Sequence, residues 1–235
     1  MQLFYSTLVQ NDHVILPEEE SWHCTRVLRM NPGDAVSVTD GQGHLFLGSL
    51  TDVSPKRCLV KILETKTEQQ RDWRLHIAIA PTKNIDRFEW FAEKATEIGI
   101  DSITPLYSKH SERTRLKPER IQKILVSAMK QSLKYTLPVL KPETSFSDFI
   151  RMNEGGSRFI AYCETGQEEE LVFQYKNGTD VTIMIGPEGD FSPEEVDMAL
   201  EAGFKAVRLG KSRLRTETAG IVACHTIHVL NTMQR

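Results

Sequence analysis

Two short segments of this 235-residue chain combine glycines with ionisable residues in an order that suits a ligand site. In the first, Ile183–Ser192, an apolar run leads into Gly186-Pro187-Glu188-Gly189. Glycine lets the backbone approach a ligand closely. The segment lacks the spacing of a phosphate-binding loop, and Pro187 removes one amide donor. The pattern favours an uncharged purine bound by main-chain groups, although an ordinary strand–helix turn also fits.

The second segment, Leu209–Ala219, is a basic loop followed by the start of an expected helix. Thr216 can cap that helix, and the carboxylate of Glu217 suits its positive end, so both residues have a structural explanation. Arg213 and Arg215 do not suit a helix N-terminus. These two residues fit an anionic partner better.

Four motifs together resemble the RsmE family, over the whole chain. They are the I-G-P-E-G-x-F-S and L-G-x-x-x-L-R-T-E-T-A segments, Lys94–Gly99 with upstream Arg87 and Glu89, and the H-x-x-x-V-L-R pattern at His23–Arg29. The resemblance implies an α/β fold of the SPOUT type with a C-terminal trefoil knot, preceded by a small PUA-like β-barrel domain. It also implies a homodimer that uses S-adenosyl-L-methionine to methylate N3 of uridine 1498 in 16S rRNA of the small ribosomal subunit.

The same resemblance assigns roles to individual residues. N3 of uridine carries a proton that must leave, so Glu217 is the candidate base and Arg215 the candidate stabiliser of the resulting anion. The expected cofactor-binding residues are Ile185, Gly186, Pro187, Glu188, Gly189, Leu209, Gly210, Leu214, Arg215, Thr216, Thr218 and Ala219. The expected RNA-binding residues are Arg26, Arg29, Lys83, Arg87, Arg113, Arg115, Lys134 and Arg213.

The chain departs from the family pattern at two places. Where the family usually has E-Q-S/C-G-R, this chain has Lys130-Gln131-Ser132-Leu133-Lys134. The swap at Lys130 puts in doubt any role of an acid there, while Lys134 keeps a basic residue at the arginine position. The usual G-P-E-G-G becomes G-P-E-G-D at Asp190.

The charge distribution favours a polyanionic partner although the net charge is −3. Residues 108–134 contain eight basic and two acidic residues, and residues 205–215 contain five basic residues and no acid. Either cluster alone is more typical of a solvated surface. The two together indicate binding to phosphates, which releases counterions.

The elements expected around these motifs divide the chain in two. Residues 1–67 suggest a small β barrel with strands at Leu3–Tyr5, Ala35–Thr39, Leu45–Leu50 and Leu59–Leu63 and one helix at Glu18–Met30, ended by Asn31-Pro32-Gly33. The polar segment Glu64–Asp72 is the natural connection. We therefore predict a PUA-like domain at 1–67, a linker at 68–72 and a methyltransferase domain at 73–235.

The second domain alternates strands with helices, which predicts a mainly parallel sheet covered on both faces. Strands are expected at Leu75–Ala80, Ile103–Tyr107, Phe159–Cys163, Val181–Ile185 and Ala206–Leu209. Helices are expected at Asp86–Ile98, Pro118–Leu133 and Thr216–Thr232, with a further helix that ends at Gly203. Ser192-Pro193-Glu194-Glu195 has the residues of a helix cap and first turn.

The remaining composition narrows the classes of protein. The chain has no apolar run of membrane-spanning length, and the sequence that starts at Met1 does not match a signal peptide. Cys24, Cys58, Cys163 and Cys224 are isolated, which fits a reducing cytoplasm, and Cys224-His225 with His228 lacks a full metal-ligand set. We expect no metal and no membrane partner. A knotted methyltransferase acting on tRNA and a catalytically silent RNA-binding protein stay open as alternatives.

Overall fold

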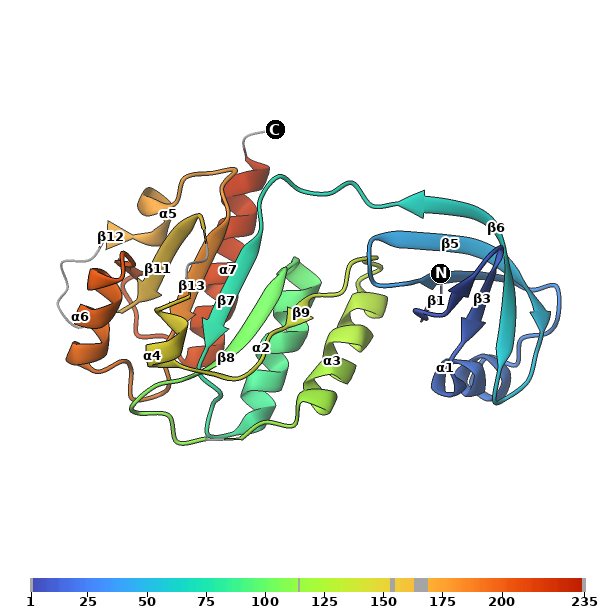
Figure 1. Cartoon of the computed structure of the whole chain (residues 1–235), viewed down its shortest axis with the longest axis horizontal. Helices are drawn as coiled ribbons and strands as arrows, with labels where there is room; N and C mark the ends of the chain where they lie inside the picture. Colours follow the sequence, from blue (N-terminus) through green and yellow to red (C-terminus); the bar gives the residue numbers. More distant parts are fainter. Residues whose placement is uncertain (1, 114, 153–154, 163–168, 234–235) are drawn as a thin grey trace. The chain divides into compact units, whose positions relative to one another are not determined.

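The computed structural model describes residues 2–113, 115–152, 155–162 and 169–233. It divides into two compact units, one of residues 1–70 and 126–137 and one of residues 71–125 and 138–235 (Figure 1). Within the described residues, none of the helices combines the length and the apolar character needed to cross a membrane.

The first unit is built on a six-stranded sheet in the order β1-β4-β5-β6-β3-β2. Its strands are β1 (Leu3–Tyr5), β2 (Val9–Gln10), β3 (His13–Leu16), β4 (Ala35–Thr39), β5 (His44–Asp52) and β6 (Cys58–Thr67). Only β1 and β4 pair in parallel, and the other neighbours are antiparallel. We expected residues 64–67 to be part of the connection, but they continue β6, because they pair with residues 44–47 of β5. Their polar side chains are exposed, so they do not prevent strand formation.

The helix of this unit ends earlier than Glu18–Met30, the range expected from the sequence. The α-helix α1 (Glu18–Trp22) passes into a π-helical turn, η1 (His23–Val27). The Leu28 amide donates to the His23 carbonyl at 3.0 Å, five residues back. Arg29 then adopts φ +53°, which ends the helix before Met30 is reached. Such π turns are rare and are often found at functional sites.

Two cysteines that are far apart in the sequence lie together in the core of this unit. Cys24 and Cys58 are both fully buried among Phe4, Val14 and Leu50. Burial and the neighbouring Cys58 thiol raise the pKa of Cys24 to about 12. A thiol with so high a pKa stays protonated and unreactive at neutral pH, so the pair serves packing. Cys163 lies outside the described residues.

The second unit has an eight-stranded sheet in which every pair is parallel, as the strand–helix alternation predicts. The order is β10-β8-β7-β13-β11-β14-β12, with β9 paired to β8. The strands are β7 (Leu75–Ile79), β8 (Ser102–Tyr107), β9 (Val139–Leu140), β10 (Thr144–Ser145), β11 (Ser157–Ala161), β12 (Glu169–Glu170), β13 (Val181–Ile185) and β14 (Lys205–Arg208). The sequence did not indicate the short strands β9, β10 and β12, because two-residue strands have no detectable periodicity.

Helices cover both faces of this sheet, since alternate strand residues point to opposite sides. On one face, α4 (Phe146–Phe149) and α6 (Pro193–Glu201) pack on Ala78, Ile160 and Met184. On the other, α7 (Thr216–Thr232) lies against α2 (Ile85–Ile98), so closely that a Cβ at Gly220 would be 2.6 Å from the Phe91 ring. The short α5 (Leu171–Gln174) packs on α7, and α3 (Pro118–Gln131) contributes residues to both units. The expected cap of α6 is confirmed as a full capping box between Ser192 and Glu195, with Pro193 in the first turn.

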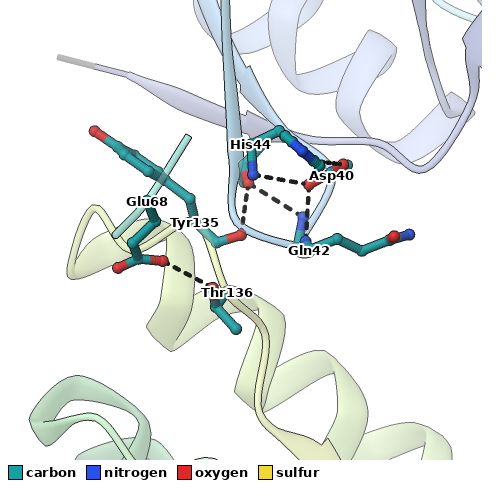
Figure 2. A network of polar contacts seen from close by, with 8 residues as sticks. Asp40, Gln42, His44, Glu68, Tyr135 and Thr136 are labelled. Carbon is teal, nitrogen blue, oxygen red and sulfur yellow. Dashed lines mark hydrogen bonds and ion pairs between the residues drawn. The ribbon is translucent and has the colours of Figure 1, made fainter. Parts of the chain in front are cut away.

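Residues 126–137 belong to the first unit through backbone hydrogen bonds to the turn between β4 and β5. The amide of Gly43 donates to the Tyr135 carbonyl at 2.9 Å, and the amide of Leu137 donates to the Gly41 carbonyl at 2.8 Å. Thr136 Oγ1 donates to Glu68 Oε2 at 2.8 Å, as Figure 2 shows. Asp40 shapes the turn by accepting from the Gln42 and His44 amides (Figure 2).

Lys130, which departs from the family pattern, forms an ion pair with an acidic residue of the same unit. The Lys130 ammonium pairs with the Glu20 carboxylate, whose side chain is only 10% exposed. A buried carboxylate without a partner is strongly unfavourable, so the cation is required where Glu20 is present. Lys130 therefore stabilises α1 against α3.

The end of α3 shows why the family pattern has glycine where this chain has Leu133. The Lys134 amide donates to the Met129 carbonyl at 3.0 Å, and the Leu133 amide to the Lys130 carbonyl at 3.2 Å. This is a Schellman motif, whose residue after the cap is left-handed and is usually glycine. Leu133 holds that conformation with φ +55° while its side chain is 45% exposed.

We expect Leu133→Gly to raise the free energy of unfolding by about 0.5–1 kcal/mol, because it removes a left-handed strain of about 1–2 kcal/mol at a smaller cost in chain entropy. Urea denaturation of the full chain measures the change. Leu133→Ala is the control, because it shortens the side chain but keeps the strain and should give no gain. A glycine variant no more stable than the wild type contradicts the strain at this residue.

Candidate functional site

The strands β13, β11 and β14 are consecutive neighbours in the sheet, and Figure 1 labels β11 and β13. A cavity of about 750 Å³ opens at the carboxyl ends of these three strands. The volume is within the range of small-molecule pockets, and parallel sheets bind ligands at this edge. Ten of the twelve expected cofactor-binding residues line it: Ile185, Gly186, Pro187, Glu188, Leu209, Gly210, Leu214, Arg215, Thr216 and Ala219. Gly189 and Thr218 are not part of the lining.

The first cavity loop follows β13 and is a tight turn. The Asp190 amide donates to the Pro187 carbonyl at 2.9 Å, and Asp190 has φ +60°, a left-handed conformation that aspartate tolerates. Its Oδ1 accepts from the Phe191 amide at 2.8 Å, and the Phe191 ring is buried in the core. Asp190 can thus replace the glycine of the usual pattern. A Cβ at Gly186 would lie 3.2 Å from both Asp190 Oδ1 and the Phe191 ring, so a larger residue there would distort this loop.

Two carboxylates near this loop accept hydrogen bonds from backbone amides of neighbouring segments. Glu188 Oε1 accepts from the Lys83 amide at 3.0 Å. Glu195 Oε1 accepts from the Lys109 amide at 2.8 Å while its Oε2 accepts from Ser192. His110 Nδ1 lies 3.0 Å from the carbonyl oxygens of Gly189 and Asp190. These carboxylates and the histidine therefore hold the rim of the cavity in place.

The second cavity loop runs from β14 into α7 and is joined to the first loop by a buried hydrogen bond. Thr216 Oγ1 donates to the Gly186 carbonyl at 3.0 Å. The expectation that Thr216 caps α7 was wrong, because Arg215 occupies the cap position and Thr216 is the first helical residue. Gly210 has φ +125°, a conformation that only glycine adopts readily.

The two expected catalytic residues occupy different environments. Arg215 is exposed and lines the cavity. Glu217 is buried at 8% exposure, is absent from the cavity lining, and has its Oε1 3.9 Å from Arg87 Nε. Within one chain the cavity lining thus includes Arg215 but not Glu217.

The expected RNA-binding residues fall into three groups. Arg26, Arg29, Arg115 and Arg213 are exposed, and Arg213 also lines the cavity. Lys83 and Arg113 have partners: Lys83 Nζ is 2.8 Å from Glu112 Oε2, and Arg113 donates to the Thr82 and Lys83 carbonyls at 3.1 and 2.9 Å. The hydrogen bond that Lys83 donates to Glu112 raises the pKa of Lys83, which stays charged. Lys134 is half-buried, as is Arg87 beside Glu217.

The sequence analysis missed six residues of the cavity lining: Ala161, Tyr162, Asp190, Arg208, Lys211 and Ser212. Lys211 and Ser212 lie at variable positions of the second loop motif, and Asp190 replaces a glycine of the first, so none of the three was expected to bind the cofactor. Ala161 and Tyr162 lie at the end of β11. The sequence predicted this strand, but not that it would lie between β13 and β14.

Within the described residues, no group of three or more His, Cys, Asp or Glu is arranged to hold a metal.

Comparison with known proteins defines the class. A family described as "RNA methyltransferase domain" matches residues 68–228, and one described as "RNA methyltransferase PUA domain" matches residues 16–63. The chain is therefore an RNA methyltransferase, an α/β enzyme with a PUA-like domain.

Relatives identify the family within this class. "Ribosomal RNA small subunit methyltransferase E" of Synechocystis is 32% identical over 92% of this chain and 73% of its own length. A structure described as "probable rRNA-methyltransferase" from Porphyromonas gingivalis is 45% identical, covers both chains fully and has a TM-score of 0.92. The Neisseria gonorrhoeae methyltransferase E bound to S-adenosyl methionine is 28% identical over 98% of each chain, with a TM-score of 0.83. The chain belongs to the ribosomal RNA small subunit methyltransferase E (RsmE) family.

We expect Thr216→Val to lower the free energy of unfolding by about 1–2 kcal/mol, because the buried Gly186 carbonyl loses its donor. Amide exchange in residues 185–190 should become faster, since this bond fixes the first loop to α7. Thermal unfolding and hydrogen-exchange mass spectrometry measure the two effects. Thr216→Ser keeps the hydroxyl and should restore both, and Thr218→Val, outside the lining, is the matched control. Unchanged exchange in Thr216→Val contradicts the role of the bond.

Proposed function

We propose that this protein uses S-adenosyl-L-methionine to methylate N3 of uridine 1498 in 16S rRNA of the small ribosomal subunit. The main support for the proposal is the cavity, which is lined by both loops that contain the family motifs. A hydrogen bond from Thr216 to the Gly186 carbonyl joins the two loops. A relative with the same fold is described as bound to S-adenosyl methionine. The uridine position follows from membership of the RsmE family.

The residues of the cavity fit this cofactor. Ile185, Pro187, Leu209 and Leu214 supply apolar surface for a purine, while Gly186 and Gly210 leave the backbone accessible. The wall also contains basic side chains that suit the anionic end of the methionine moiety. The cofactor supplies the methyl group on its sulfonium, and the enzyme has to align donor and acceptor for an in-line displacement.

The protein must also stabilise uridine as its N3 proton leaves. Arg215 is suited to this, because an exposed guanidinium in the cavity wall can donate to O2 or O4 as negative charge develops there. We propose Glu217, two positions after Arg215 in the same motif, as the base. The Arg87 guanidinium, with Nε 3.9 Å from Glu217 Oε1, restricts the orientation of the Glu217 side chain, and a base has to be held in position.

Exposed basic residues are proposed to bind rRNA phosphates. Arg26 and Arg29 belong to the PUA-like unit, and Arg115 and Arg213 to the methyltransferase unit. Arg113 has a second role, since its guanidinium already binds the two carbonyls that shape the 82–84 turn. Phosphate contacts fix the register of the RNA, while the identity of the target base is decided in the cavity.

We further propose a C-terminal trefoil knot, a homodimer and a cytoplasmic location, as in the family. The outward face of α7 supports the dimer: Ile221, Val222 and Val229 are apolar and at least partly exposed, although the opposite face of the helix is buried against α2. Apolar side chains left on the outward face of a packed helix are expected at an interaction surface. A backbone trace in an experimental electron-density map tests the knot, and microscopy of a tagged chain tests the location.

The proposal is tested with small ribosomal subunits and 16S rRNA prepared from cells without such an enzyme. Incubation with the protein and S-adenosyl-L-methionine should produce 3-methyluridine, and mass mapping should place it in the fragment that contains nucleotide 1498. Methylation of tRNA instead would support a tRNA enzyme, and cofactor binding with no methylated product would support a silent RNA-binding protein. Either result contradicts the proposed function.

Variants in the same assay separate RNA binding from chemistry. Arg115→Gln and Lys134→Gln should raise KM and flatten the salt dependence of RNA binding by about one unit per phosphate contact, with kcat nearly intact. Arg215→Gln and Glu217→Gln should instead lower kcat at an unchanged salt slope, and Glu217→Gln should recover as alkaline pH ionises the uridine. Full kcat of Glu217→Gln at neutral pH would show that Glu217 is not the base.

Light scattering at micromolar concentration should give twice the mass of one chain. Val222→Glu on the outward face of α7 should shift the protein to monomers, because a charge cannot be buried in an apolar contact without a partner. Leu63→Glu is the matched control: this residue is 71% exposed on β6 and should leave the dimer intact. A wild-type protein that is monomeric under these conditions contradicts the dimer.

A further inference from the structure

Arg208 has a buried donor for which the part of the chain that the structure describes provides no acceptor. The residue ends β14 and is part of the cavity lining. Its Nε is buried and has no hydrogen-bond partner among the described residues. An unpaired donor of a cation is unfavourable inside a protein, so a ligand acceptor at this point would be stabilising.

The strand register places Arg208 at one side of the cavity. Ala161 of β11 pairs with Val207, and the Tyr162 amide donates to the Val207 carbonyl at 3.1 Å. Arg208 and Tyr162 are thus neighbours at the carboxyl ends of adjacent strands, and both line the cavity. The other basic residues of the lining, Lys211, Arg213 and Arg215, all follow β14 in the loop and are exposed. The backbone of Arg208 is fixed by its pairing with Glu170 of β12 and by that of the preceding Val207 with Ala161 of β11.

We infer that Arg208 binds the α-carboxylate of the methionine moiety of S-adenosyl-L-methionine and so selects the complete cofactor. The inference rests on the proposed function. A guanidinium fork matches a carboxylate better than any other side chain does. The acidic residues of the lining, Glu188 and Asp190, belong to the first loop, so the anionic end of the ligand is favoured on the side of β14. The apolar residues of both loops remain for the purine.

Two ligands that differ in this carboxylate test the inference by calorimetry. S-adenosylhomocysteine retains the amino-acid end, whereas 5′-methylthioadenosine lacks it. Arg208→Gln should weaken binding of S-adenosylhomocysteine by about 10- to 100-fold, the range of a charge-assisted hydrogen bond. Binding of 5′-methylthioadenosine should stay close to the wild-type value. Arg208→Lys keeps the charge without the Nε donor and should show a smaller loss, again for S-adenosylhomocysteine alone.

Lys205→Gln is the matched control, because it removes an exposed cation of the same strand that lies outside the cavity lining, and it should leave both affinities nearly unchanged. Equal losses of both ligands in Arg208→Gln would mean that Arg208 shapes the cavity as a whole, and this overturns the inference. An unchanged affinity for S-adenosylhomocysteine overturns it as well. If Arg208→Gln does not fold, the ratio of the two affinities in Arg208→Lys decides by the same criterion. A wild-type protein that binds neither ligand contradicts the proposed function instead.

Discussion

The hydrogen bond from the Thr216 hydroxyl to the Gly186 carbonyl fixes the geometry on which the site depends. It joins the loop after β13 to the start of α7, two segments thirty residues apart in the chain. Both groups are buried, so the bond is shielded from competition with water. With these loops held together, the ends of β11, β13 and β14 enclose one cavity.

Around this bond, ionisable side chains act as structural supports. Glu188 and Glu195 accept from the amides of Lys83 and Lys109, and Arg113 donates to the carbonyls of the 82–83 segment. Charged partners make these bonds stronger than those between neutral groups. The segments that border the cavity are thereby attached to one another through side chain–backbone contacts, which explains how irregular loops can hold a defined site.

Each departure from the family pattern has a local explanation. Lys130 neutralises the buried carboxylate of Glu20. Asp190 holds the left-handed position of a glycine and forms a hydrogen bond to the Phe191 amide, whereas Leu133 holds a similar position at the end of α3 without a hydrogen bond from its side chain. The two substitutions therefore differ in kind, since aspartate forms a local bond that leucine cannot form.

Sequence patterns were sufficient to predict the parallel sheet, its main strands, the capping box of α6 and the two loops that contain the cofactor motifs. These features depend on local patterns: apolar periodicity, glycine and proline positions, and cap residues. Tertiary structure decided the rest. Thr216 donates a hydrogen bond to the Gly186 carbonyl, and Glu217 lies beside Arg87 outside the cavity lining. Cys24 and Cys58 lie in the same core, and Arg208 is part of the cavity lining. These contacts depend on which segments become neighbours in the fold. That arrangement is set by packing between residues far apart in the chain, so it cannot be predicted from local sequence patterns.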